Sequence, residues 1–146
     1  MVHALEEIRR LLKPGGKLID IHPIPEGFFI KALQRGRILF AERKRETCSD
    51  DVLRAEDALA ESIVRNLFAV DRRAEFDFLT YAPSVRELRV YWEELNAYDD
   101  DPTDETIIAR EEELYAQVEQ ILQASGAGAE VAIHERARIA RLRPVK

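Results

Sequence analysis

Apolar residues recur along the chain with two different periods, and the changes between them predict the elements. From His3 to Leu12 they fall three or four residues apart, as on the buried face of a helix. The turn Lys13-Pro14-Gly15-Gly16 follows, where proline forbids further helix and glycine permits positive φ. Lys17 to His22 is short and rich in branched residues, which predicts a strand ended by Pro23.

The same signals continue to the C-terminus. The expected elements are an extended segment at Arg37–Glu46, a helix from Asp50 or Asp51 to Phe68 that buries Leu59 and Ile63, a strand at Ala74–Tyr81, a helix capped by Ser84, a longer helix capped by Thr103 and closed by Gly126, and a strand at Glu130–Leu142. Together they predict an α/β to α+β protein in which helices flank a small mixed sheet.

Length and composition agree with one domain, residues 1–146. The chain is 46% hydrophobic and 34% charged, a balance typical of globular proteins rather than of disordered chains. No apolar run approaches the roughly 20 residues of a membrane helix, and no secretory signal opens the chain. The single cysteine, Cys48, favours a reduced, cytoplasmic protein.

The net charge of −6 is unevenly distributed. Residues 1–73 hold 14 basic and 12 acidic side chains, whereas residues 74–146 hold 8 and 16. An acidic second half repels phosphate backbones, so we expect no nucleic-acid partner.

Ala4 to Ile21, Ala-Leu-Glu-Glu-Ile-Arg-Arg-Leu-Leu-Lys-Pro-Gly-Gly-Lys-Leu-Ile-Asp-Ile, resembles a segment of class I S-adenosylmethionine-dependent methyltransferases. The resemblance is to the helix, Lys-Pro-Gly-Gly turn and fifth strand of that Rossmann-like fold. It implies that Ala74–Tyr81 is strand six and Glu130–Leu142 is strand seven, an antiparallel pair in which strand seven lies beside strand five. The chain would then be equivalent to the distal half of the fold, a truncated methyltransferase-like domain.

The family binds its cofactor through strands one to four, beginning with a Gly-x-Gly loop after strand one, and the sequence has no counterpart of these strands or of that loop. Its only double glycine, Gly15-Gly16, precedes a strand instead of opening a helix. We therefore carry over no catalytic, cofactor-binding or metal residue, and we expect an isolated chain without enzymatic activity. S-adenosylmethionine would bind only if a partner supplied the missing half.

One group of residues could form a ligand pocket. Asp20 and His22 alternate onto one side of a strand near its carboxyl end, where ligands gather in open α/β sheets. With Glu26 they could act as a general base or hold a metal, and Trp92 could line a small-molecule pocket. The alternatives are a polar strand end that meets solvent and a tryptophan that belongs to the core.

Other polar clusters have structural interpretations. Arg43-Lys44-Arg45 lies between Glu42 and Glu46, so we expect a nearly neutral, solvated arm. Asp99-Asp100-Asp101 lacks the spacing of a calcium loop and suits a helix-capping loop.

Several functions stay open. The first is a non-catalytic methyltransferase-like protein that forms a homodimer through the edge at Lys17–His22 and the helix at Ala4–Leu12, because loss of strand four exposes that edge. The others are a subunit or fragment of a split enzyme, and a small-ligand binding module. A monomer would result if Arg37–Glu46 folded back onto the open edge.

Overall fold

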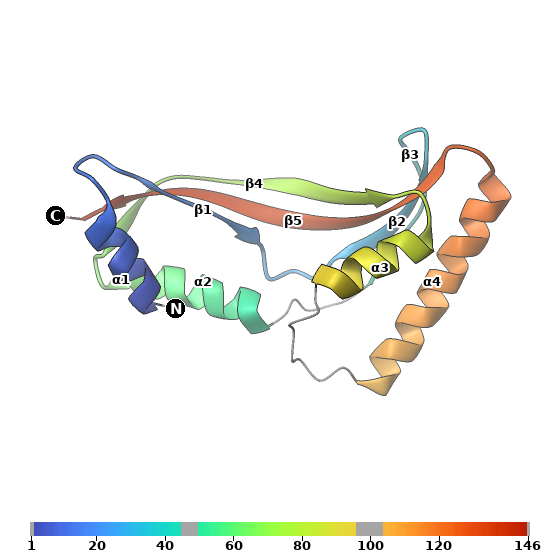
Figure 1. Ribbon diagram of the computed structural model, residues 1–146, viewed down its shortest axis with the longest axis horizontal. Coiled ribbons are helices and arrows are strands. Elements are labelled where there is room, and N and C mark those ends of the chain that lie inside the picture. Colours follow the sequence, from blue (N-terminus) through green and yellow to red (C-terminus); the bar gives the residue numbers. More distant parts are fainter. Residues whose placement is uncertain (1, 45–49, 96–103, 146) are drawn as a thin grey trace. The chain divides into compact units, whose positions relative to one another are not determined.

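Long strands dominate the computed structural model, which describes residues 2–44, 50–95 and 104–145 (Figure 1). Over these residues it has an α+β fold of four helices and five strands. The helices are α1 (Val2–Leu11), α2 (Asp50–Val64), α3 (Val85–Leu95) and α4 (Glu105–Ser125). The strands are β1 (Leu18–Pro23), β2 (Phe29–Gln34), β3 (Arg37–Arg43), β4 (Phe68–Ala82) and β5 (Ala129–Pro144).

Strand β5 is the common partner in the sheet. It pairs with β1 over residues 137–142 and with β2 over residues 129–134, while β4 also pairs with it. Strand β3 pairs with β2. The expected α+β fold with a small sheet flanked by helices is confirmed, and the pairs β1–β5, β2–β3 and β2–β5 are antiparallel where a mixed sheet was expected. Strands β2 and β3 are joined by a two-residue turn, which only an antiparallel pair allows.

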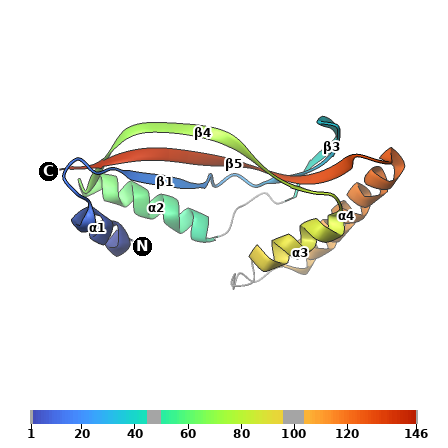
Figure 2. The ribbon, with the colours of Figure 1, turned by 45° about the horizontal axis from the view of Figure 1, so that its top comes forward.

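The chain divides into two compact units, and β4 and β5 contribute to both. The first unit contains residues 1–26, 48–77 and 136–146, and the second contains residues 27–47 and 78–135. Figure 2 shows the same strands from a second direction. Each unit has a core of its own and is described separately below.

In the first unit, α1 and α2 cover one face of the strands (Figures 1 and 2). The register sets Leu18 opposite Leu142 and Asp20 opposite Ala140, so these side chains share the covered face because strand neighbours alternate sides. The buried residues of its hydrophobic core cluster are Leu59, Phe68, Ala140 and Leu142. Leu5, Ile8 and Leu12 of the predicted helical stripe pack against them.

In the second unit, α3 and α4 pack beside the β2–β3 hairpin. The hairpin turns at Arg35 and Gly36, whose φ angles are 50° and 78°. Two positive values suit the right-handed twist of the strands. The larger core of this unit includes Ile30, Leu88, Val118 and Ile133, all fully buried.

Most expected elements are present, and some boundaries differ. Ser84 caps α3 by accepting a hydrogen bond from the Glu87 amide at 3.2 Å, as predicted. Helix α2 ends at Val64 instead of Phe68, because Asn66 has a φ of 55° that no helix continues through. Phe68 begins β4.

Two further predictions need correction. The cap of α4 is Asp104, which accepts a hydrogen bond from the Thr106 amide at 2.7 Å; Thr103 lies outside the described residues. Lys44 does not belong to a solvated arm, because its side chain is 1% exposed. Cys48 and the aspartates 99–101 also lie outside the described residues. No helix of the described chain is long and apolar enough to cross a membrane.

Candidate functional site

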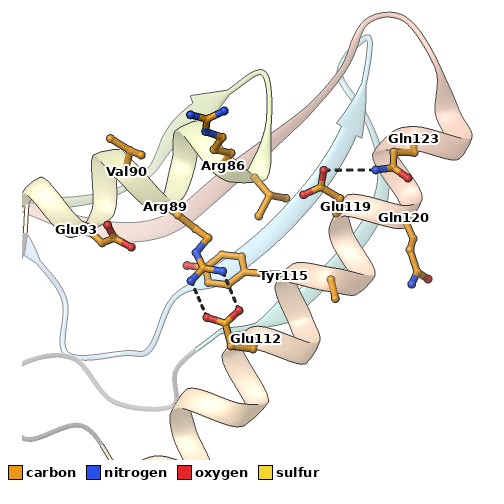
Figure 3. Close-up of a pocket in the computed structure, with 11 residues that line it drawn as sticks. Arg86, Arg89, Val90, Glu93, Glu112, Tyr115, Glu119, Gln120 and Gln123 are labelled. Carbon is orange, nitrogen blue, oxygen red and sulfur yellow. Dashed lines mark hydrogen bonds and ion pairs between the residues drawn. The ribbon is translucent and has the colours of Figure 1, made fainter.

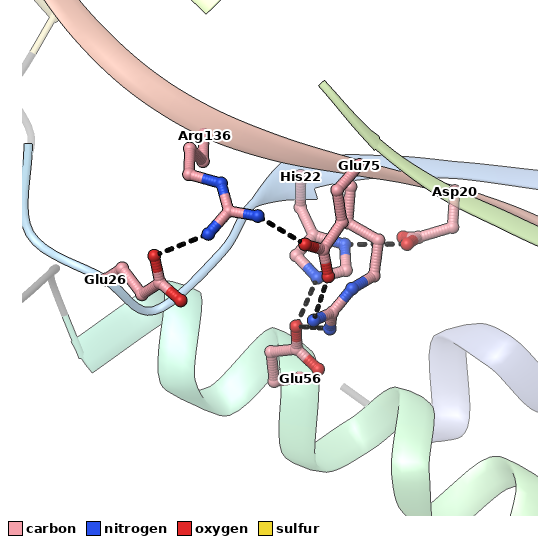
Figure 4. Close-up of polar contacts among 7 residues, drawn as sticks. Asp20, His22, Glu26, Glu56, Glu75 and Arg136 are labelled. Carbon is pink, nitrogen blue, oxygen red and sulfur yellow. Dashed lines mark hydrogen bonds and ion pairs between the residues drawn. The ribbon is translucent and has the colours of Figure 1, made fainter. Parts of the chain in front are cut away.

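Asp20 and His22 lie together on the helix-covered face of the first unit. The register places them opposite Ala140 and Arg138 of β5, and Glu56 of α2 reaches the same place (Figure 4). The His22 side chain is 10% exposed. The alternation of residues 20 and 22 along the strand was therefore a sound guide to their common direction.

His22 lies between two carboxylates. Its Nδ1 is 2.6 Å from Asp20 Oδ2, and its Nε2 is 2.9 Å from Glu56 Oε1. The two ring nitrogens of His22 therefore link Asp20 of β1 to Glu56 of α2.

Two arginines of β5 extend this cluster to Glu26. Arg138 donates to Glu56 and to Glu75 of β4, and Arg136 donates to Glu75 at 2.8 Å and to Glu26 at 3.0 Å. Figure 4 shows the contacts in sequence from Asp20 to Glu26. The structure thus brings three of the four predicted site residues into one ion-pair network. We call it the His22 network.

The His22 network is suited to holding elements together. Its carboxylates alternate with His22 and the two arginines, and both nitrogens of His22 contact carboxylates of the protein itself. No set of three or more histidine, cysteine, aspartate or glutamate side chains in the described ranges is placed to hold a metal ion. A ligand role for Asp20, His22 and Glu26 stays a prediction.

Trp92, the fourth predicted residue, belongs to the second unit. It is partly buried against that core, and its ring centroid lies 4.9 Å from that of Phe28. Trp92 therefore packs against the core, as the second interpretation expects. Its ring also faces the buried ammonium group of Lys44.

A groove of about 610 Å³ lies between α3 and α4 (Figure 3). Arg89 of α3 donates two hydrogen bonds to Glu112 of α4, at 2.8 and 2.7 Å. Its guanidinium carbon lies 5.1 Å from the centre of the Tyr115 ring. The hydrogen bonds to Glu112 raise the pKa of Arg89 above its ordinary value, although burial opposes them. The sequence did not indicate this groove, because its walls come from two separate helices.

The other face of the first unit's strands carries exposed apolar side chains. Ile19 is 52% exposed and Ile21 is 60% exposed. Ile19 also lines a shallow hollow of about 290 Å³ with Ala74 and Ile139. Large aliphatic groups gathered at a strand edge are typical of surfaces that contact another polypeptide.

Comparison of the chain with protein-family models, curated proteins and solved structures gives no match.

Proposed function

We propose that this chain is a methyltransferase-like module that binds no S-adenosylmethionine alone and forms a homodimer through β1. The proposal treats the module as the distal half of the fold and assigns it no catalytic residue. A reduced, cytoplasmic setting and the absence of a nucleic-acid partner are part of it, on the grounds of cysteine usage and acidic charge.

The pairing of the strands supports the first part. The resemblance implies that strand seven lies beside strand five and forms an antiparallel pair with strand six. At the corresponding positions β5 pairs with β1, and β4 pairs with β5. The turn before β1 agrees as well, since Gly15 has a φ of 78°.

The free edge of β1 carries the second part. Among the described residues, β1 pairs with β5 alone, so its other edge presents unpaired amides and carbonyls. The alternative in which Arg37–Glu46 covers this edge is wrong for the described residues, because β3 pairs with β2. The stripe of α1 already packs within the first unit, so the interface proposed here is confined to β1 and the face of Ile19 and Ile21.

A second copy is the occupant that fits this edge. An antiparallel strand can pair with itself across a two-fold axis, which gives a closed dimer. The two copies of Ile19 and Ile21 would then form one apolar cluster beside the hollow at Ile139.

Sedimentation equilibrium tests the homodimer. We expect a dimer in the micromolar range, and we expect Ile19→Lys and Ile21→Lys to shift the chain towards monomer by at least tenfold in dissociation constant. Ile38→Lys is the matched control, because Ile38 is also 52% exposed on a strand but lies in β3. A monomeric wild type, or equal dissociation constants for all three variants, would contradict the dimer.

Calorimetric titration with S-adenosylmethionine tests the cofactor statement separately. We expect no saturable heat from the purified chain, because its Gly126-Ala127-Gly128 follows a helix and precedes a strand instead of opening a helix, as a cofactor loop does. Binding with one-to-one stoichiometry and micromolar affinity would overturn it, whatever the oligomeric state.

A further inference from the structure

Lys44 holds a buried positive charge in the second unit. Its side chain is 1% exposed, and its backbone amide donates to the Phe28 carbonyl at 2.8 Å. The residue directly follows β3, so the hairpin fixes its position. A buried ammonium is costly unless its surroundings replace water.

Among the described residues, three aromatic rings and one carboxylate lie around this ammonium. Nζ lies 5.3 Å from the ring centre of Phe28, 5.4 Å from that of Trp92 and 5.3 Å from that of Tyr115. Glu111 Oε2 lies 2.7 Å from Nζ. We call these four residues the ammonium cage.

The cage is built from separate, well-packed elements. Phe28 precedes β2, Trp92 belongs to α3, and Glu111 and Tyr115 lie four residues apart on α4, a spacing that puts them on one helix face. Phe28 and Tyr115 are 8% and 7% exposed. The rings therefore stay in place through the core and do not depend on Lys44 alone.

The chemistry of the cage selects a monovalent alkylammonium ion. Aromatic faces attract cations within about 6 Å of the ring centre, and such boxes recognise ammonium groups that carry alkyl substituents. The Glu111 carboxylate supplies a negative charge beside the ammonium. We propose that the cage is an alkylammonium-binding site that Lys44 occupies, and that it takes a free alkylammonium ion when the Lys44 side chain is removed. This site is independent of the proposed homodimer.

Chemical rescue of Lys44→Ala tests the site. n-Propylammonium supplies the three carbons and the nitrogen that the variant lacks, so it is the probe. We expect its chloride salt to raise the Tm of Lys44→Ala by several degrees with saturation at millimolar concentration, and to leave wild type unchanged because Lys44 fills the cage. If the variant is unfolded without the amine, recovery of its circular dichroism spectrum on addition of n-propylammonium is the same result.

Three controls separate a specific site from a general salt or solvent effect. Sodium chloride and n-propanol at equal concentration should not rescue the variant. Lys31→Ala, which removes a lysine side chain from β2 of the same unit, should not respond. Adding Glu111→Gln to Lys44→Ala should weaken the response at least tenfold, because the neutral amide cannot balance the ligand's charge. An equal response in any of these controls, or none in Lys44→Ala, would overturn the site.

A spectrum of wild type tests the cage without any variant. The ε-methylene group of Lys44 is bonded to Nζ, which lies over three rings, so we expect its proton NMR signals to be displaced upfield from those of the other lysines. Signals at the ordinary lysine position would contradict the cage.

Discussion

Glu56 connects side chains from different strands. One of its oxygens, Oε1, lies 2.9 Å from His22 Nε2 and also accepts a hydrogen bond from Arg138. The sequence alternation predicted that Asp20 and His22 share a face, but it did not indicate Glu56 or Arg138. Those residues are 34 and 82 positions from their partners, and single-sequence patterns carry no information on such distant pairs.

Glu56→Gln should cost about 1–2 kcal/mol of unfolding free energy, because hydrogen bonds to a charged acceptor are stronger than those to a neutral one. Asp57→Asn is the control, since Asp57 is the next residue of α2 and is exposed; its cost should stay within about 0.5 kcal/mol. Urea denaturation measures both. Equal costs would mean that the His22 network does not stabilise the fold.

Glu135 gives the fold a pH dependence of known sign. Burial raises the pKa of Glu135, although nearby His134 opposes the shift. A carboxyl group whose pKa is raised on folding binds its proton more tightly in the folded state, so protonation of the group stabilises the folded state. Its stabilising effect is therefore complete below the unfolded-state pKa and is lost as the pH rises through the folded-state value.

Glu135→Gln should accordingly raise the Tm by about 1–3 °C at pH 7 and give no gain once the pH falls below the ordinary pKa of glutamate. Glu42→Gln, at an exposed position of β3, should leave the Tm nearly unchanged at both pH values. Thermal unfolding followed by circular dichroism provides the measurement. A gain that persists in acid would rule out ionisation of Glu135 as its cause.

At the level of elements, glycine and proline were better guides than hydrophobic stripes. The turn after α1 was located from its sequence, whereas the end of α2 was not, because a single asparagine at positive φ leaves no periodic signal. The expected buried stripe of α2 is confirmed at Leu59 and wrong at Ile63, which is 36% exposed, while Ala58 and Ser62 are buried instead. The contacts of Glu56 with His22 and Arg138 match this rotation of the helix.

Strand β2 shows a different limit. Phe29–Gln34 was not predicted, although Arg35-Gly36 with extended residues on both sides is a hairpin signal. With one residue of the turn an arginine, the usual Asn-Gly pattern was missing. Lys44 was misjudged for a related reason, since its charged neighbours concealed a side chain that turns into the core.

The two glycines after α1 are required for different structural reasons. Gly15 has positive φ with open space around it, whereas a Cβ on Gly16 would lie 2.9 Å from the Lys13 carbonyl oxygen. Gly15→Val should cost more than about 1 kcal/mol because a branched residue avoids this conformation, and Gly15→Asn should cost less. Denaturant unfolding compares them. Equal costs would show that φ at residue 15 does not set the turn.

At the level of the whole molecule, two cores of unequal size share two strands. Among the described residues, the hydrophobic core cluster of the first unit contains four buried residues and that of the second unit contains eleven. The sequence indicated one domain without this division, because the strands that join the units run through it without a linker. Since buried apolar contacts set local stability, the first unit should open more readily.

Hydrogen exchange at single-residue resolution tests that difference. We expect amides of α1 and β1 to exchange at least tenfold faster than amides of α4 and β2. Leu142→Ala should widen the gap by speeding exchange in the first unit. Identical protection in both units, in wild type and variant alike, would show that they unfold together.

The two outer strands of the first unit, β1 and β4, differ in how many charged side chains they carry. This difference limits how far association through the sheet edges can proceed. Growth of a fibre would require β1 of one copy to add to β4 of the next, a head-to-tail contact that never closes. Strand β4 resists such addition because charged side chains recur along it, namely Asp71, Arg72, Arg73, Glu75 and Asp77. Strand β1 has only Asp20 and His22 between its ends, and both point to the helix-covered face. If two chains pair through β1 as proposed, we expect association to end at the dimer, because the charged side chains of β4 oppose the addition of a further strand.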